Sequence, residues 1–176
     1  MMEINLGHFM IRDLRQGDEE AIARHANNPN IFRNVRDRFP HPYTVDNAKW
    51  WIAHASSANP MTDFAIVVEG EAVGGIGFMM QEDIFRRSVE IGYWLGEAYW
   101  GRGIVTAAVR AMTEYIFANF DVCRIYAGVF EWTPGSMRVL EKAGFTCEGR
   151  MRKAATKHGQ TMDEFIYALV KEEGDK

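Results

Sequence analysis

The feature that most constrains the fold of this sequence is a change of hydrophobic period across two closely spaced glycines. Before the glycines, apolar residues alternate with others, which is typical of a strand with one buried face: Val89, Ile91, Tyr93 and Leu95. After the glycines, apolar residues share one face of a helix: Val105, Ala108, Val109, Met112 and Ile116. The sequence therefore predicts a strand that leads through Gly101 and Gly103 directly into a helix.

This glycine segment, Trp100-Gly101-Arg102-Gly103, combines residues that suit an anion-binding turn. Glycine adopts backbone conformations closed to other residues, and at a helix start the backbone N–H groups can converge on an anion. Arg102 adds a positive charge. No Gly-Lys-Ser/Thr ending marks a Walker-type loop, and Thr106 stands where a dinucleotide fingerprint needs a third glycine. An ordinary strand-to-helix turn would also explain two glycines, so the segment alone leaves both interpretations open.

The rest of the chain alternates strand-like and helix-like segments in an irregular order. Strands are expected at residues 9–12, 64–68, 73–80, 89–95, 125–129, 146–155 and 161–169. Helices are expected to begin at Asp18, at Thr44, after Gly103 and at Pro134, and residues 30–43 read as a long, partly helical loop. The Asp18 carboxylate is expected to offset the exposed N–H groups of the first helix, and residues 157–160 to turn the final hairpin. The order indicates a mixed α+β fold rather than a regular βαβ repeat.

Composition limits the class of protein. The chain has 176 residues, 47% hydrophobic and 25% charged, which fits one globular domain over residues 1–176. A formal net charge of −4 argues against broad attraction to nucleic acid or acidic membranes. Neither a secretory signal nor a membrane-spanning run is recognisable, so a cytoplasmic location is expected. Cys123 and Cys147 lack the spacing of a zinc site or a disulfide framework; we expect buried free thiols and no bound metal.

The glycine segment resembles the acyl-CoA pyrophosphate-binding motif of the GNAT superfamily, Gln/Arg-x-x-Gly-x-Gly/Ala. Gly103 matches strictly, Trp100 replaces Gln/Arg, and Val105 replaces the small final residue. The variant Tyr-Trp-Gly-Lys/Arg-Gly-x-x-Thr is similar to the RimJ/RimL-like branch, which acetylates N-termini of ribosomal proteins. Residues 90–95 resemble the strand before that loop, and residues 136–145 resemble its Ser-x-x-x-x-Glu-Lys-x-Gly-Phe helix. The resemblance covers nearly the whole chain.

The resemblance implies a GNAT acyl-CoA N-acyltransferase fold with about four helices. The mixed, mostly antiparallel sheet would have seven strands and splay between strands 4 and 5. Acetyl-CoA is the implied co-substrate, with its pyrophosphate on the glycine loop and its pantetheine arm along the exposed edge of the preceding strand. The implied cofactor-binding residues are Tyr93, Trp94, Leu95, Gly101, Arg102, Gly103, Ile104, Val105, Thr106, Thr133 and Ser136. Thr133 stands where the family often has asparagine.

Three residues are candidates for the chemistry of acetyl transfer to an amine. Ser136, in the first turn of its helix, would hydrogen-bond the departing sulfur; a serine that satisfies a helix-start N–H is the alternative. Glu90 shares a strand face with Gly92 and could accept the amine proton, directly or through water. Glu148 is the second candidate base. Water and backbone carbonyls suffice in many such enzymes, so neither carboxylate is required by the resemblance.

The acceptor is open at this stage. A protein N-terminus, or a protein lysine, is the first hypothesis, and a small amine, such as a polyamine, amino acid or antibiotic, is the second. A non-catalytic acyl-CoA-binding sensor and an aminoacyl-transferase without a CoA site are further alternatives. Arg33, Arg36 and Arg38 could grip an anionic group of the acceptor or simply be solvated. Trp51 fits the apolar stripe of its helix, whereas Trp50 is freer to face a pocket, and either a monomer or a homodimer is expected.

Overall fold

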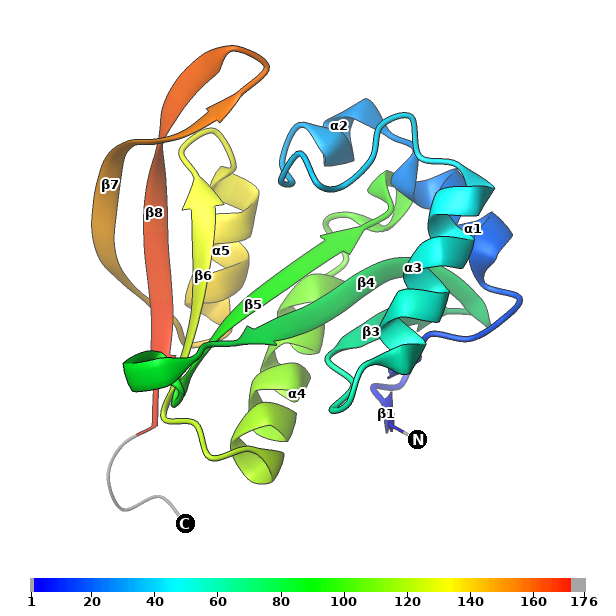
Figure 1. The fold of residues 1–176 in the computed structure, drawn as a ribbon, viewed down its shortest axis with the longest axis horizontal. Helices are drawn as coiled ribbons and strands as arrows, with labels where there is room; N and C mark the ends of the chain where they lie inside the picture. Colours follow the sequence, from blue (N-terminus) through cyan, green and yellow to red (C-terminus); the bar gives the residue numbers. More distant parts are fainter. Residues whose placement is uncertain (1, 172–176) are drawn as a thin grey trace. The chain divides into compact units, whose positions relative to one another are not determined.

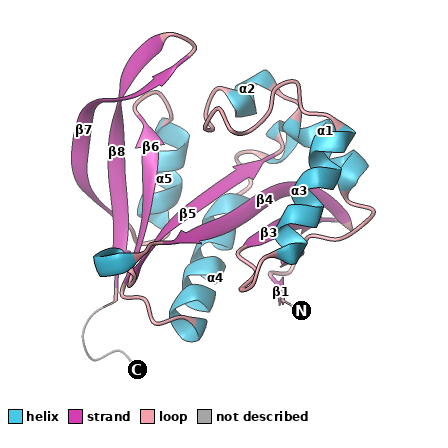
Figure 2. Ribbon diagram, viewed as in Figure 1, coloured by secondary structure: helices cyan, strands magenta, loops and turns pink. Residues whose placement is uncertain are grey.

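The computed structural model describes residues 2–171, which contain eight strands and five helices (Figures 1 and 2). The strands are β1 (Glu3–Asn5), β2 (Phe9–Asp13), β3 (Asp63–Val68), β4 (Glu71–Met80), β5 (Ser88–Leu95), β6 (Arg124–Phe130), β7 (Thr146–Lys157) and β8 (Gln160–Val170). The helices are α1 (Glu19–Ala26), α2 (Pro29–Phe32), α3 (Val45–Ser57), α4 (Ile104–Asn119) and α5 (Pro134–Lys142). Two 3₁₀ turns, η1 (Asp83–Phe85) and η2 (Glu97–Tyr99), flank β5.

The strands form one sheet in the order β1-β2-β3-β4-β5-β6-β8-β7. The pairs β1–β2, β2–β3, β3–β4, β6–β8 and β7–β8 are antiparallel and β5–β6 is parallel, so the predicted mixed, mostly antiparallel α+β fold is confirmed. The predicted strand number of seven was one too low because β1 has only three residues, too few for a recognisable alternation. The fifth helix is α2, a single turn inside the segment read as a partly helical loop.

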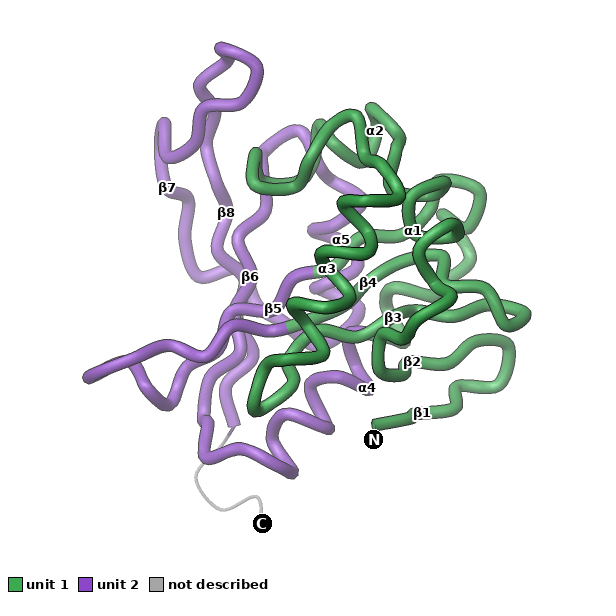
Figure 3. Tube along the Cα trace, turned by 45° about the vertical axis from the view of Figure 1, so that its right-hand side comes forward, with its two compact units in different colours: residues 1–77, 93–108 green, residues 78–92, 109–176 purple. Residues whose placement is uncertain are grey.

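The chain forms two compact units, and each consists of two separate stretches of sequence (Figure 3). Unit 1 comprises residues 1–77 and 93–108, and unit 2 comprises residues 78–92 and 109–176. The elements β4, β5 and α4 therefore contribute residues to both units. None of the helices in the described range 2–171 is long and apolar enough to cross a membrane.

Unit 1 is built on a core between two helices and the strands they cover. Helix α1 packs against α3, and both contribute small or branched side chains to the core: Ile22, Ala23, Ala26, Ala48, Ile52 and Ala55. Trp51 packs against this core and the Trp50 side chain is 64% exposed, as the helical period predicted. Thr44 caps α3 as expected, because its hydroxyl accepts the N–H of Asn47 while Asn47 Oδ1 accepts the N–H of Thr44.

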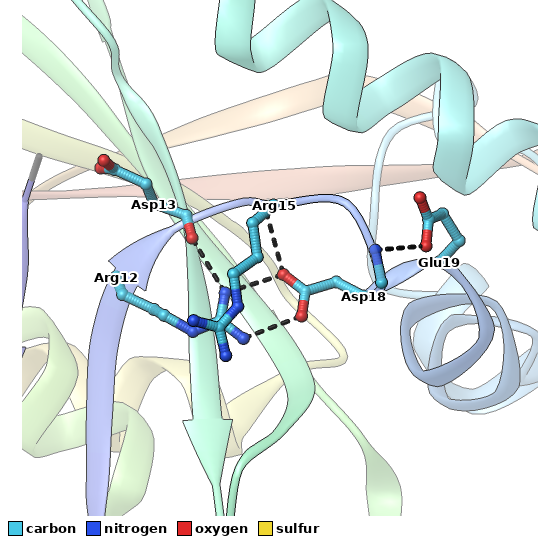
Figure 4. Close-up of polar contacts among 6 residues, drawn as sticks. Arg12, Asp13, Arg15, Asp18 and Glu19 are labelled. Atoms are coloured by element: carbon cyan, nitrogen blue, oxygen red, sulfur yellow. Dashed lines mark hydrogen bonds and ion pairs between the residues drawn. The ribbon is translucent and has the colours of Figure 1, made fainter.

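A buried ion pair joins β2 to the start of α1 (Figure 4). The Arg12 guanidinium donates two hydrogen bonds to the Asp18 carboxylate, at 2.7 and 2.8 Å, and the side chains are only 5% and 7% exposed. The backbone N–H of Arg15 donates to the same carboxylate at 3.1 Å. Asp18 does mark the helix start, but its side chain makes no cap hydrogen bond. The predicted capping role was wrong because the carboxylate is taken by Arg12.

Unit 2 contains the three-stranded ribbon β6-β8-β7 and helix α5 (Figure 1). Strand β8 pairs with β6 over seven residues and with β7 on its other side. The predicted hairpin turn is confirmed: His158 and Gly159 have φ of 50° and 74°, the left-handed values of a tight hairpin turn. Strand β7 lies at the edge of the sheet, and Cys147 on it is exposed. The expectation of a buried thiol at Cys147 was therefore wrong, and Cys123 is partly buried.

Candidate active site

The glycine loop of unit 1 presents a row of backbone N–H groups at the start of α4. Gly101 and Gly103 have φ of 73° and 76°, in the left-handed region that L side chains rarely adopt. An added Cβ at either glycine would meet no atom within 4 Å, so conformation rather than packing requires glycine here. Among the described residues, the N–H groups of residues 102–106 have no protein acceptor, and the first N–H that donates is that of Ala107, to Gly103 O. These N–H groups lie at the positive end of the helix dipole, an arrangement that suits an anion.

Hydrogen bonds hold the residues that lead into this loop. The Trp100 indole Nε1 donates to Leu95 O at 2.7 Å, which ties the loop back to the end of β5. Glu97 in η2 accepts hydrogen bonds from the side-chain amides of Asn28 and Asn30, at 2.7 and 3.0 Å. These contacts lower the pKa of the Glu97 carboxyl, Asn28 contributing most. The loop is thus fastened to the segment that begins α2.

The strand end before the loop is shaped by glycines of β4. A Cβ at Gly74 would come within 2.5 Å of Trp94 O, and a Cβ at Gly75 within 2.6 Å of the Trp94 indole nitrogen. The absence of these side chains lets β4 approach the backbone of Trp94 and its ring closely. The Trp94 ring also meets Phe39 in a T-shaped contact, with centroids 5.8 Å apart. Trp94 is therefore contacted by both β4 and the segment before α3, within unit 1.

The parallel pairing of β5 with β6, within unit 2, is short. It joins Ser88–Glu90 to Arg124–Tyr126, and no further β5–β6 pair is found in the described chain although both strands continue. Gly92, next after the paired residues and Ile91, is exposed, and a Cβ there would meet nothing within 4 Å. This is the splay predicted between strands 4 and 5, which become β5 and β6 once β1 is counted. Glu90 is half-buried at the point where the pairing ends, and Val89 and Ile91 on the other face are buried.

Thr133 and Ser136 lie at the start of α5 in unit 2. Thr133 occupies the N-cap position, but its side chain makes no cap hydrogen bond. Its hydroxyl oxygen is buried and has no hydrogen-bond partner within residues 2–171. The backbone N–H of Ser136 donates to Thr133 O at 3.0 Å. A buried hydroxyl without a hydrogen-bond partner lowers the stability of a folded protein. Such a hydroxyl is compatible with a hydrogen bond to a bound molecule.

Glu148 makes an ion pair with Arg124. Its two carboxylate oxygens accept hydrogen bonds from Arg124, at 2.8 and 2.5 Å. The Arg124 hydrogen bonds hold the pKa of the Glu148 carboxyl below its usual value. A carboxylate stabilised in its charged form is a weaker proton acceptor, so this ion pair argues against Glu148 as a base.

The arginine-rich loop is on the surface of unit 1. Arg33, Arg36 and Arg38 are all exposed. Burial raises the pKa of the Asp63 carboxyl, and the nearby Arg38 charge opposes this rise. Exposed arginines are accessible to an acceptor, and the role of this loop in acceptor binding stays a prediction.

The predicted site residues divide between the two units, and each unit brings its own set together. Unit 1 assembles the strand end and the glycine loop, residues 93–106, whereas unit 2 carries Glu90, Thr133, Ser136 and Glu148. The supporting contacts of Asn28, Asn30 and Gly74 were missed, because partners far apart in sequence leave no local signal. No group of three or more metal-ligating side chains occurs in the portion that the structure describes.

Residues 8–146 match the family described as the Acetyltransferase (GNAT) domain. The chain belongs to the GNAT acetyltransferases. The N-acetyltransferase p20 of Bacillus licheniformis, itself described as uncharacterized, is 33% identical over 169 residues, which cover 93% of each chain. The L-amino acid N-acetyltransferase AaaT of Escherichia coli is 26% identical over 94% of this chain and all of that protein.

The RimJ/RimL-like resemblance is confirmed by further relatives. The ribosomal-protein-serine acetyltransferase of Escherichia coli is 30% identical over 107 residues, 61% of this chain and 59% of that protein. Among solved structures, RimL, a ribosomal L7/L12 α-N-protein acetyltransferase in complex with coenzyme A, superposes with a TM-score of 0.85. It is 20% identical and the match covers 97% of this chain and 98% of that one. This GNAT acetyltransferase thus shares its fold with RimL, a protein whose structure contains bound coenzyme A.

Proposed function

We propose that this GNAT acetyltransferase transfers acetyl from acetyl-CoA to the primary amine of a protein N-terminus, by direct attack in a ternary complex. The observation that carries the proposal is the row of N–H groups at residues 102–106 without a protein acceptor among the described residues. A pyrophosphate carries several acceptor oxygens and negative charge, which such a row satisfies. We place the reaction in the cytoplasm, where acetyl-CoA is available.

The residues present fit acetyl-CoA. Gly101 and Gly103 have the left-handed φ values found in anion-binding turns, and the buried Thr133 hydroxyl has a hydrogen bond to give. Residues 101–106 would hold the pyrophosphate and the strand edge Tyr93–Leu95 the pantetheine amides. Acetyl-CoA supplies the activated thioester carbonyl.

Two side chains would serve the transfer. Ser136 donates its hydroxyl proton in a hydrogen bond to the sulfur that departs, which stabilises the negative charge there. Glu90 accepts the proton that the amine loses, directly or through one water. The ion pair of Glu148 with Arg124 supports Glu90 as the first of the two candidate bases.

Named relatives support two acceptor classes. The ribosomal-protein-serine acetyltransferase supports a protein N-terminus, and the full-length match to AaaT supports a free L-amino acid as the second candidate. The two classes differ in size and in the free carboxylate next to the amine. A panel that contains both distinguishes them.

Calorimetry with acetyl-CoA is the first test, followed by thiol release with N-terminal peptides, L-amino acids and polyamines. We expect stoichiometric binding of acetyl-CoA and turnover with peptides. An absence of acetyl-CoA binding would overturn the proposal, tight binding without any turnover would indicate a sensor, and turnover with amino acids alone would shift the acceptor class.

Replacing Glu90 with glutamine should lower kcat by roughly 10²- to 10⁴-fold, the usual contribution of a general base. The Kd for acetyl-CoA should stay unchanged, because Glu90 acts on the amine. Steady-state thiol release measures kcat, and calorimetry measures the Kd.

Two further variants sharpen that experiment. Glu148→Gln tests the second candidate base and should keep most of the activity, whereas Ser136→Ala should lower kcat by roughly 10- to 100-fold through loss of one hydrogen bond to developing charge. Equal activity of Glu90→Gln and the wild type would show that water or backbone groups take the proton.

A further inference from the structure

An irregularity of the final hairpin projects two positive charges from unit 2. Met151 of β7 pairs with Glu164 of β8, and the next pair joins Ala155 to Met162. Between these two pairs, residues 152–154 of β7 lie opposite Asp163 alone on β8. Strand β7 therefore carries a bulge at residues 152–154, which we call the basic bulge. Arg152 and Lys153 in it are both exposed.

A single buried carboxylate pins the basic bulge. Asp163 of β8 is 8% exposed, and its Oδ1 accepts the backbone N–H of Lys153 at 2.8 Å. Its Oδ2 accepts Arg150 Nε at 2.5 Å. The Lys153 N–H, and then Arg150, lower the pKa of the Asp163 carboxyl, so that it stays ionised. The conformation of the bulge is therefore specified by the protein.

The pinned conformation is one that lysine rarely adopts. Lys153 has φ of 53°, in the left-handed region, although it carries a Cβ. Strained residues of this kind persist only where the surrounding structure holds them, and they gather at functional sites. Positive charge on an edge strand also discourages pairing with other chains, but that purpose requires neither a left-handed lysine nor a buried carboxylate.

Positive charge is concentrated around the basic bulge, although the chain as a whole is acidic. Residues 149–158 hold four Lys and Arg and no Asp or Glu, whereas the whole chain has a net charge of −4. Arg150 is committed to Asp163 and Lys157 is buried. Arg150 is also exposed but is paired with Asp163, so the other exposed cations of the segment are those of the basic bulge, Arg152 and Lys153.

The basic bulge is fastened to the short segment that leads from β6 into α5, the helix of Ser136. Asp163 exchanges hydrogen bonds with Glu131, the residue after β6: its N–H donates to Glu131 Oε1 at 3.0 Å, and its carbonyl accepts the Glu131 N–H at 3.1 Å. Two residues on from Glu131, Thr133 begins the turn into α5 and Ser136 lies in its first turn. Figure 1 shows the β7–β8 hairpin beside this β6–α5 loop. An acceptor held near Ser136 therefore has the basic bulge as a neighbour on unit 2.

We propose that Arg152 and Lys153 form a specificity-determining site for anionic acceptors, which selects protein N-termini with Asp or Glu in the first few positions after the reacting amine. The proposal rests on the proposed N-terminal acetyltransferase function. Each cation pairs with an acceptor carboxylate, and the Asp163 pin holds both cations in place before the acceptor arrives.

The test compares acetylation of two amidated peptides, Ser-Glu-Asp-Glu-Ala-Ala and its neutral isostere Ser-Gln-Asn-Gln-Ala-Ala. With two exposed contacts of about threefold each, the wild type should prefer the acidic peptide by roughly tenfold in kcat/KM at low salt. The double variant Arg152→Gln, Lys153→Asn should bring this ratio to about one. Asparagine is chosen for position 153 because it tolerates left-handed backbone. The Kd for acetyl-CoA and kcat with the neutral peptide should stay unchanged.

Two further variants make the result specific. Lys142→Gln removes an exposed cation at the end of α5 and should keep the tenfold ratio, which excludes an effect of net charge. Asp163→Asn leaves both cations in the chain but weakens their pin, so the ratio should fall to between one and ten while the circular dichroism spectrum is retained. Equal rates for the two peptides with the wild type, or an unchanged ratio in the double variant, would overturn the inference alone. Acetylation of neither peptide would instead overturn the proposed function on which it rests.

Discussion

Replacing Gly103 with valine should weaken acetyl-CoA binding by about 100-fold or more while the protein remains folded. Gly103 has φ of 76°, a conformation that a β-branched residue adopts only with strain. Relief of that strain turns the N–H groups of the loop away from their common target. Charge-assisted hydrogen bonds contribute roughly 1.5–3 kcal/mol each, so the loss of one or two accounts for the expected change. Isothermal titration calorimetry with acetyl-CoA measures it.

Gly159 supplies the matched control for this variant. It has φ of 74° and, like Gly103, no atom within 4 Å of an added Cβ, but it lies in the β7–β8 turn. Gly159→Val therefore imposes similar backbone strain and should leave the Kd for acetyl-CoA unchanged. If both variants bound acetyl-CoA as the wild type does, the phosphates would have to lie elsewhere than on residues 101–106.

Replacing Asp18 with asparagine should lower the free energy of unfolding by roughly 3–5 kcal/mol, the usual effect of breaking a buried ion pair from one side. The side chains of Arg12 and Asp18 are 5% and 7% exposed, so the Arg12 charge would remain buried without compensation. Arg12 Nη1 also donates to Asp13 O at 2.9 Å, but this neutral acceptor does not compensate the charge, and Arg12 Nε has no partner among the described residues. Urea unfolding followed by circular dichroism at pH 7 gives the value.

An exposed pair shows whether burial is the reason. Arg87 and Asp121 also form an ion pair, with side chains 56% and 89% exposed. Asp121→Asn should cost less than about 1 kcal/mol, because solvent screens such pairs. A double replacement, Arg12→Met with Asp18→Leu, should be less destabilising than Asp18→Asn alone, since it leaves no buried charge. Equal losses for Asp18→Asn and Asp121→Asn would contradict this account.

The sequence was informative wherever burial follows a simple period. Ala108, Val109, Met112 and Ile116 are all fully buried in α4, as their helical spacing predicted. The turn at His158–Gly159 was equally predictable, because its backbone requires residues that tolerate positive φ. Both features depend on residues close together in the chain, and a sequence pattern contains this local information.

Features made by distant partners could not be predicted in the same way. Asp18 looks like a helix cap in sequence, and only the fold shows that Arg12 claims its carboxylate. The basic bulge depends on a register shift between β7 and β8, and its pin, Asp163, lies ten residues from Lys153. The single local sign of it was a run of four cations without an acidic residue in 149–158.

The interleaving of the two units limits how the protein can be dissected. A fragment that ends at residue 77 lacks the strand end and glycine loop of unit 1, and a fragment that begins at residue 109 lacks the β5 segment to which β6 pairs. No contiguous piece of the chain therefore contains either unit whole without part of the other. If the chain is cut between residues 78 and 92, each half contains part of unit 1 and part of unit 2. Mixing such halves, or exchanging them between relatives, would therefore divide both units. Chimaeras of this enzyme are better made by exchanging surface segments, such as residues 149–158, than by joining blocks of sequence.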